Sequence, residues 1–171
     1  MRYVTFSARN ESTQQIGVVW DDRVIGLRKA IGDTWGGPFP ASLLELIQIG
    51  PEAWRRMALL GGASLPAAGI FEGSYPLAEV RLHAPIPRPA KNVFCLGLNY
   101  VSHMEESARA RGREIKIPEV PVFFTKAPTS ISGPYDPIPW DTAVTQQVDY
   151  EAELGVVIGI GGKNIPRAKA L

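Results

Sequence analysis

Three acidic residues alternate with apolar or small ones in the run Val148-Asp149-Tyr150-Glu151-Ala152-Glu153-Leu154. In a strand, side chains two residues apart share a face, and their backbone positions lie about 6–7 Å apart. Glu151 and Glu153 can therefore converge on one cation, and such an oxygen-rich site suits Mg²⁺, Mn²⁺ or Ca²⁺. An amphipathic edge strand with a solvated acidic face explains the same pattern.

Two features of this run favour a metal site over a solvated strand. Glutamate is a poor strand former, so its repetition here calls for another reason. The run also continues into Val156-Val157-Ile158, which is typical of a strand covered on both faces. Buried carboxylates need a partner, and a metal ion is one. We therefore expect a strand over Val148–Ile160 that carries two metal ligands.

A histidine and a glutamate form a second reactive pair. Ser102 and Glu105 have the spacing of a capping box, which predicts that a helix begins at Ser102. His103 would then lie in the first turn, where the helix dipole favours the neutral imidazole that a general base needs. Glu106 follows three residues later and could orient His103 or relay a proton. An exposed first turn with glutamates complementing the dipole is the alternative.

A lysine stands where an apolar strand ends and a long loop begins. Lys126 follows a strand predicted over Val120–Thr125, and residues 127–147 are rich in Pro, Gly, Ser and Thr. A loop of this length is usually functional, so Lys126 is well placed to bind an anionic substrate. Ordinary solvation of a strand end explains the lysine equally well. Cys95, in a short apolar strand, is expected to serve packing.

The first 80 residues predict a small α+β lobe without obvious chemistry. Alternating apolar residues and turn signals predict a hairpin, and helix signals follow it. The expected elements are strands over Val4–Ala8, Ile16–Trp20 and Val24–Leu27, a helix over Leu43–Ile49 capped by Ser42, a helix from Pro51 through Leu60 ended by Gly61-Gly62, and a loop over 63–76.

A proline-rich linker separates this lobe from the part that carries the chemistry. Pro85, Pro87 and Pro89 favour an extended chain, so residues 81–90 are expected to be the linker and residues 91–171 the catalytic domain. The elements expected in that domain are strands over Val93–Leu96, Val120–Thr125 and Val148–Ile160 and a helix over Ser102–Arg111.

Composition excludes several classes of protein. The 171 residues carry a net charge of +1, without the basic excess typical of nucleic-acid binders. A single cysteine excludes a disulfide framework within the chain. No apolar run reaches the roughly 18 residues of a membrane span, and the N-terminus lacks a secretory signal. We therefore expect a cytoplasmic globular protein that binds neither nucleic acid nor membrane.

Three ordered motifs together resemble the fumarylacetoacetate hydrolase family. They are Gly97-Leu98-Asn99-Tyr100 with His103 and Glu106, then Phe123-Phe124-Thr125-Lys126-Ala127-Pro128, and finally Asp149 through Gly159. The resemblance runs from about Lys91 to Gly162, and it is looser for residues 1–80. It implies an α+β, β-rich fold, with a small N-terminal α+β lobe followed by an incomplete mixed β-roll.

The resemblance also assigns roles to residues. Glu151 and Glu153 match the family's metal-binding acids, with Mg²⁺ the first choice and Mn²⁺ or Ca²⁺ as alternatives. His103 and Glu106 match the pair that activates water or moves a proton, and Lys126 matches a lysine near the substrate. The family is usually dimeric and acts on small anionic keto acids, so a homodimer is expected. Members generally continue further, so we expect a third metal ligand beyond Leu171.

The chemistry leaves the reaction open. A metal-dependent hydrolase that cleaves a carbon–carbon bond in an acylpyruvate-like or fumarylacetoacetate-like diketo acid is the first expectation, because a metal stabilises the developing negative charge and a neutral histidine deprotonates water. A decarboxylase or isomerase, acting on oxaloacetate or 2-hydroxymuconate-type substrates, would use the same electron sink. A third possibility is an inactive truncated fragment or a non-catalytic interaction module.

Overall fold

The computed structural model of the chain describes residues 1–64, 72–110, 112, 114–115 and 117–170. The chain divides into two compact units, of which one comprises Met1–Ile86 with Ser132–Leu171 and the other comprises Pro87–Ile131. Below, Met1–Ile86 is called the lobe and Pro87–Ile131 the hairpin unit. The sequence-based division at 80 and 91 stays a prediction.

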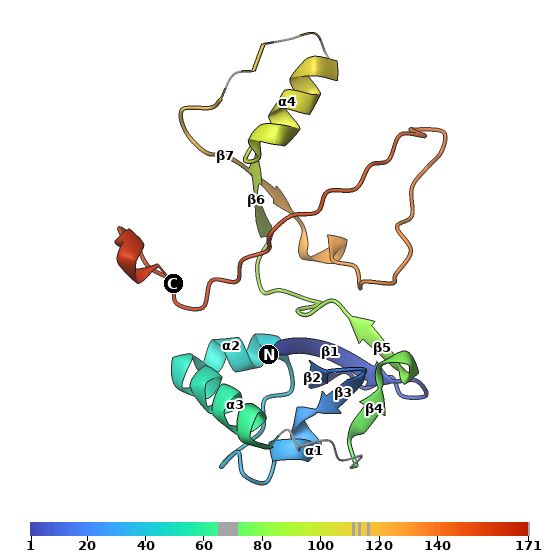
Figure 1. The fold of residues 1–171 in the computed structure, drawn as a ribbon, viewed down its shortest axis with the longest axis vertical. Helices are drawn as coiled ribbons and strands as arrows, with labels where there is room; N and C mark the ends of the chain where they lie inside the picture. The colour runs from blue at the N-terminus through green and yellow to red at the C-terminus, as the bar shows by residue number, and fades with distance from the viewer. Residues whose placement is uncertain (65–71, 111, 113, 116, 171) are drawn as a thin grey trace. The chain divides into compact units, whose positions relative to one another are not determined.

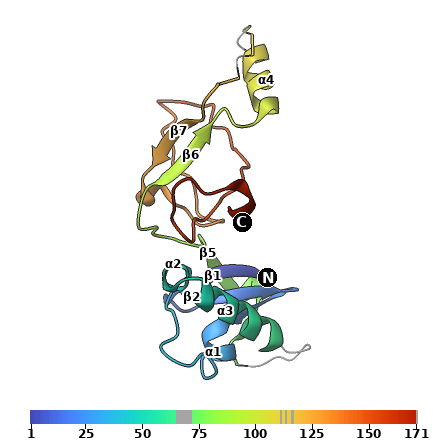
Figure 2. The ribbon, with the colours of Figure 1, turned by 90° about the vertical axis from the view of Figure 1, so that its left-hand side faces the viewer.

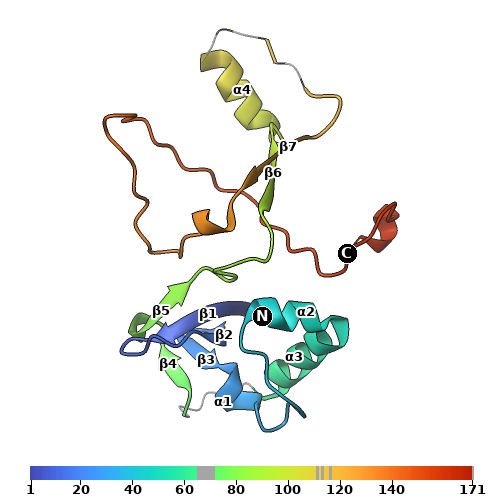
Figure 3. The same ribbon diagram turned by 180° about the vertical axis from the view of Figure 1, so that it is seen from behind.

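The lobe is built on an antiparallel five-stranded sheet in the order β4-β3-β2-β1-β5, with α2 and α3 side by side beside it (Figures 1 and 3). The mixed α+β class expected from the sequence is confirmed. The elements of the lobe are β1 (Arg2–Ala8), β2 (Gln15–Trp20), β3 (Arg23–Gly26), α1 (Leu27–Ile31), α2 (Leu43–Ile49), α3 (Pro51–Ser64), β4 (Ser74–Pro76), the 3₁₀ turn η1 (Leu77–Glu79) and β5 (Val80–His83).

The core of the lobe forms where these helices meet the sheet. Ile16 and Val18 of β2 are buried because they share one face of the strand. Ala53 and Met57 of α3 face them with the four-residue spacing of a helix stripe, and Met57 is fully buried. Removing this apolar surface from water is the main stabilising contribution to the lobe.

Helix α2 begins as the sequence predicts. The Ser42 side-chain oxygen accepts a hydrogen bond from the Glu45 backbone N–H at 3.1 Å. The Glu45 carboxylate in turn accepts the Ala41 backbone N–H at 2.6 Å. Both bonds satisfy donors near the helix start that no intrahelical carbonyl can reach.

Helix α3 differs from its prediction at the C-terminal end. It runs to Ser64, past the glycine pair that was expected to stop it at Leu60. A glycine costs a helix only about 1 kcal/mol, which does not by itself end one. Gly61 is also buried, and a Cβ there would touch the Met1 sulfur at 3.4 Å. The loop expected over 63–76 is therefore shorter, since Ser74–Pro76 is β4; residues 65–71 lie outside the described residues.

The hairpin unit contains two antiparallel strands and a helix, and Figure 2 shows the strands side by side. Its elements are β6 (Val93–Gly97), α4 (Val101–Ala110), β7 (Val122–Lys126) and the 3₁₀ turn η2 (Pro128–Ser130). Helix α4 begins one residue before the predicted start, so Ser102 lies inside the helix and the predicted N-cap is wrong. The predicted last residue, Arg111, lies outside the described residues.

The third predicted strand is not formed. Residues 148–160, called the acidic segment below, contain no strand, and η3 (Arg167–Lys169) is the next regular element in the described part of the chain. A strand exists only where a neighbouring strand supplies hydrogen-bond partners. Among the described residues, one sheet consists of the strands β1 to β5 and the other of β6 and β7, and neither includes the acidic segment. Val156 and Ile158, expected to be covered, are 70% and 73% exposed.

Among the helices of the described residues, none has the length and apolar character needed to cross a membrane.

Candidate metal and catalytic site

Helix α4 places the predicted acid–base pair on its exposed side. His103 and Glu106 are both exposed, whereas Met104 is buried. Residues three apart lie about 60° from each other around a helix, so both side chains project from neighbouring positions of one surface. The helix therefore places both residues on one surface, while their role as an acid–base pair stays a prediction.

The turn that leads into α4 holds an unusual backbone. Leu98 has φ +56°, which is the left-handed region that bulky side chains avoid. Two residues later, the backbone carbonyl oxygen of Tyr100 accepts the Met104 backbone N–H at 3.1 Å, which closes the first helical turn. A strained residue of this kind costs about 1–3 kcal/mol, and such residues concentrate at functional sites. The strained backbone and the sequence motif therefore both mark the Gly97–Tyr100 turn as part of the candidate site.

Lys126 ends β7 in the same unit. It pairs in register with Val93 of β6, and its ammonium nitrogen lies 5.9 Å from the centre of the Phe124 ring. The strand predicted over Val120–Thr125 is found over Val122–Lys126, so the lysine belongs to the strand and the loop starts after it. Lys126 is exposed, which leaves its charge accessible to an anion.

Glu151 and Glu153 lie in the acidic segment, and both are exposed. Because no strand forms there, the alternation that was expected to bring both carboxylates to one face is not imposed by a sheet. The segment has a local hydrogen bond instead, from the Tyr150 backbone N–H to the Asp149 carboxylate at 2.8 Å. The proposed ligands are thus present as chemical groups, but no sheet of the described residues brings them to one face.

The fit to a divalent metal is partial. Carboxylate oxygens are the donors that Mg²⁺ and Mn²⁺ prefer, so the chemistry of Glu151 and Glu153 is suitable. The described residues contain no cluster of three or more His, Cys, Asp or Glu side chains able to hold a metal ion. Two carboxylates by themselves do not make a complete all-protein site for such an ion.

Sequence reasoning passed over a polar cluster between β1, β5 and the loop that follows the hairpin unit. Ser7 Oγ and His83 Nε2 are 3.0 Å apart, and Arg81 contacts Asp136 at 2.8 Å. Burial, and then the nearby Arg81 guanidinium, lower the pKa of His83. The Gly133 backbone N–H, followed by Arg81, lowers the pKa of Asp136. No sequence motif marks this cluster, because strand pairing brings its members together.

The Ser7 and His83 pair resembles part of a nucleophilic site only in composition. Ser7 is 3% exposed, so its hydroxyl does not reach solvent or a substrate. Its contact with His83 joins two neighbouring strands and satisfies a buried hydroxyl. We therefore assign this pair to the stability of the lobe.

Comparison with known proteins decides the family. A sequence model described as fumarylacetoacetate (FAA) hydrolase, C-terminal, matches residues 92–171. The chain is also 39% identical over 158 residues to the oxaloacetate tautomerase YisK of Bacillus subtilis, which covers 91% of this chain and 51% of that protein. The chain belongs to the fumarylacetoacetate hydrolase family. The resemblance found in the three motifs is thereby confirmed.

Two further relatives of the chain are proteins from animals. It is 33% identical over 147 residues to the mitochondrial oxaloacetate tautomerase Fahd2a of Rattus norvegicus, covering 82% of this chain and 42% of the relative. It is 31% identical over 173 residues to the mitochondrial oxaloacetate tautomerase fahd2 of Xenopus laevis, covering 100% and 48%. The chain thus spans about half the length of the curated relatives it matches.

Solved structures of the same fold agree. A protein described as HpcE from Mycobacterium smegmatis is 29% identical with a TM-score of 0.51, covering 82% of this chain and 41% of that one. Maleylpyruvate hydrolase from Sphingobium sp. SYK-6, solved with manganese(II) and pyruvate, is 24% identical with a TM-score of 0.51, covering 81% and 41%. The second likeness concerns the fold alone.

Proposed function

We propose that this chain forms part of a metal-dependent tautomerase that interconverts the keto and enol forms of a small 2-oxo dicarboxylic acid such as oxaloacetate. One observation carries the proposal: the three motifs lie within a sequence 39% identical over 158 residues to a relative named as an oxaloacetate tautomerase. The exposed His103–Glu106 pair on α4 supports the proposal, because tautomerisation requires a group that moves a proton.

The reaction itself is a proton transfer. A base removes a proton from C3, and the electron pair of that C–H bond becomes the C2–C3 double bond. The π pair of the carbonyl moves onto its oxygen, which receives a proton, so atoms and charge balance. We assign the C3 proton to the His103 imidazole, which is a suitable base when neutral. Glu106, on the same side of α4, holds the imidazole in orientation or passes the proton on.

Lys126 would bind the substrate through charge. An ammonium group at the end of β7 can attract a carboxylate and hydrogen-bond to it. Oxaloacetate carries two carboxylates, so one cation outside the metal site would help to fix its orientation. This role predicts that Lys126→Met raises KM more than it lowers kcat.

A divalent cation would be held by Glu151 and Glu153. Such an ion supplies positive charge that stabilises negative charge developing on a substrate oxygen. Mn²⁺ is tested beside Mg²⁺ because a protein of the same fold was solved with manganese(II) and pyruvate. The carboxylates of this chain contribute negative charge and oxygen donors, and they need further ligands from protein or water.

Carbon–carbon hydrolysis, the first expectation from the sequence, is less well supported than isomerisation. The relatives from Bacillus subtilis, Rattus norvegicus and Xenopus laevis are all named as oxaloacetate tautomerases. Hydrolysis also needs a positioned water molecule, which proton transfer within the substrate does not. We therefore rank the tautomerase first.

The experiment follows three products in parallel. The purified chain is mixed with oxaloacetate and with an acylpyruvate, in Mg²⁺ or Mn²⁺, while enol absorbance, CO₂ and new carboxylic acids are measured. Faster keto–enol exchange without CO₂ or cleavage supports the proposal. Cleavage or CO₂ release would contradict it, and no catalysis together with no metal binding would favour a non-catalytic module.

Matched variants assign the roles. We expect His103→Gln to slow exchange by about 10²–10⁴-fold, the usual contribution of a positioned acid–base group. Glu106→Gln should also slow exchange, whereas Glu105→Gln, one position away on the same helix, is the control. Glu151→Gln with Glu153→Gln should weaken Mn²⁺ binding in calorimetry, with Glu119→Gln as control. If a test variant and its control have equal effects, the role assigned to the tested residue is wrong.

The assembly and location of the protein also remain proposals. We propose a homodimer, which sedimentation of the purified chain would test. The cytoplasmic location expected from the sequence stays a prediction, and two of the relatives are named as mitochondrial.

A further inference from the structure

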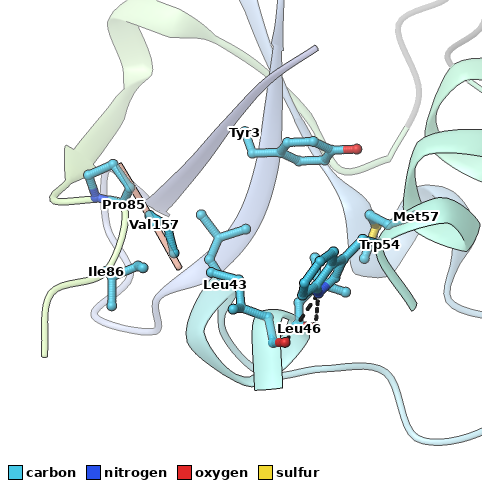
Figure 4. Close-up of a pocket in the computed structure, with 9 residues that line it drawn as sticks. Tyr3, Leu43, Leu46, Trp54, Met57, Pro85, Ile86 and Val157 are labelled. Carbon is cyan, nitrogen blue, oxygen red and sulfur yellow. Dashed lines mark hydrogen bonds between the residues drawn. The ribbon is translucent and has the colours of Figure 1, made fainter. Parts of the chain in front are cut away.

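An apolar groove lies on the lobe, and none of the residues that line it has a role in the proposed reaction. It encloses about 290 Å³ and is shown in Figure 4. Its walls come from β1, α2, α3 and the chain after β5, through Tyr3, Leu43, Leu46, Trp54, Met57 and Ile86. One further wall residue, Val157, comes from the acidic segment in the same unit.

Two hydrogen bonds to α2 fix the orientation of the Trp54 ring. Its indole N–H donates to the backbone oxygens of Leu46 at 3.0 Å and Ile47 at 3.2 Å, as the dashed lines in Figure 4 show. These carbonyls lie in the last turn of α2, where a helix leaves backbone oxygens open to donors from outside it. The polar edge of the ring is thereby satisfied inside the lobe, so its six-membered ring is free to form an apolar contact surface.

Gly159 lies directly against that surface. A Cβ atom at this position would be 2.9 Å from Cζ3 and 3.0 Å from Cζ2 of Trp54, and closer still to Cη2. Real Cβ atoms do not approach aromatic carbons so closely, and two hydrogen bonds keep the ring from moving aside. Only glycine fits at this contact.

The residues beside Gly159 show that the contact is one-sided. Val157, two residues earlier, lines the groove and is 59% exposed, while Val156 and Ile158 are more exposed, at 70% and 73%. Alternate residues of an extended chain point to opposite sides. Val157 and Gly159 thus face the lobe, and their neighbours face away.

A second contact joins the same stretch of chain to the lobe. Arg81 of β5 contacts the Asp136 carboxylate at 2.8 Å, and the Gly133 backbone N–H donates to the other carboxylate oxygen at 2.8 Å. The chain between Asp136 and Gly159 is therefore attached to the lobe at both ends. Closing a loop in this way reduces the conformations open to it.

We propose that the groove is an internal docking site for an extended apolar peptide of the pattern Val-x-Gly, occupied here by Val157-Ile158-Gly159 of the same chain. The valine forms part of the groove wall together with Ile86, and the glycine allows the backbone to approach the Trp54 ring. Arg81 and Asp136 form the second attachment. This inference goes beyond the proposed function, because none of these residues takes part in the proton transfer.

Glycine substitutions with matched surroundings test the docking. Gly159→Ala places a methyl group against Trp54, whereas nothing lies within 4 Å of a Cβ at Gly155 or Gly161. We expect Gly159→Ala to shift the Trp54 indole N–H resonance in a ¹⁵N correlation spectrum. Gly155→Ala and Gly161→Ala should leave it in place. The resonance is assigned by its loss in Trp54→Phe.

Proteolysis measures release of the loop. Glu151 and Glu153 lie between the two attachments, so a glutamate-specific protease reports how often the loop leaves the lobe. We expect Gly159→Ala to raise cleavage there by about tenfold, since overpacking of this size is costly. Arg81→Gln should raise it less, because its ion pair is exposed.

Two results would overturn the proposal. One is an unchanged Trp54 resonance and cleavage rate in Gly159→Ala relative to Gly161→Ala. The other is a change in the Trp54 resonance of the wild-type chain when that chain is diluted, because the segment would then occupy the groove of a second copy. Neither result bears on oxaloacetate tautomerisation, so failure of the docking and failure of the proposed function are distinguishable.

Discussion

The lobe and the hairpin unit bury their apolar side chains to very different degrees. In the lobe, Phe6, Val18 and Leu27 are completely buried. In the hairpin unit, Phe94 of β6 and Phe123 of β7 are 69% and 64% exposed, and no residue of β7 is buried. A two-stranded sheet cannot enclose a core by itself, whereas five strands with two helices beside them can.

This difference teaches where stability and chemistry reside. Helix α4 and strand β7, which hold His103, Glu106 and Lys126, contain a single buried residue, Met104, and every residue of the acidic segment is exposed. The lobe supplies the stable framework and carries none of the residues assigned to the reaction. Substitutions of the same type in both regions should therefore have unequal effects.

The largest contrast is expected for phenylalanine. Phe6→Ala removes a fully buried ring that packs against Tyr75 at 5.7 Å between centroids, and should lower the free energy of unfolding by about 3–5 kcal/mol. Phe123→Ala should change it by about 0.5 kcal/mol or less. Urea unfolding followed by circular dichroism measures both. If Phe6→Ala does not fold, Phe6→Leu should still unfold earlier than Phe123→Leu; the reverse order would contradict the contrast.

Glycine gives the next contrast. At Gly17 of β2, a Cβ would lie 2.7 Å from a Phe6 ring carbon and 2.8 Å from a Val24 methyl, so Gly17→Ala should cost about 1–3 kcal/mol. At Gly97 of β6, the nearest atoms are 3.7–3.9 Å away, which is ordinary contact. Gly97→Ala should stay within about 0.5 kcal/mol of wild type. Similar losses in both variants would mean that β6 is packed as tightly as β2.

Serine gives a smaller contrast. Ser42→Ala removes the hydrogen bond to the Glu45 backbone N–H and should cost about 1 kcal/mol. Ser102 lies within α4, where alanine is the better helix former, so Ser102→Ala should stabilise by up to about 0.5 kcal/mol. Thermal unfolding of the two variants compares them. A loss in Ser102→Ala equal to that in Ser42→Ala would restore the capping box predicted from the sequence.

The smallest effect is a pH dependence confined to the lobe. Burial first, and then the Arg81 charge, lower the pKa of His83 in the folded state below the value near 6.5 of the unfolded chain. At pH values between the folded and unfolded pKa of His83, the unfolded state therefore binds more protons than the folded state. This contribution to stability is full above about pH 6.5 and falls as the pH drops below it. Unfolding curves at pH 5 and 7.5 measure the loss. His83→Gln should remove part of it, while an unchanged difference would exclude His83 as its source.

Much of the lobe could be predicted because its signals are local. Alternating apolar residues and the Ser42 cap involve neighbours in sequence, and the first two strands and the cap were found where they were predicted. The third strand, predicted over Val24–Leu27, ends at Gly26, because Leu27 begins α1. The family was predictable for another reason. The order and spacing of the three motifs are properties of the sequence, whatever the backbone does between them.

What the sequence determined was the chemistry available: the His103–Glu106 spacing on a helix, the lysine at the end of an apolar strand and the two glutamates two residues apart. Tertiary structure decided the rest. The strand predicted over Val148–Ile160 needs a partner strand, and among the described residues the acidic segment contacts the groove at Trp54 instead. The reason is physical, because a helix satisfies its own backbone hydrogen bonds whereas a strand depends on another segment to do so.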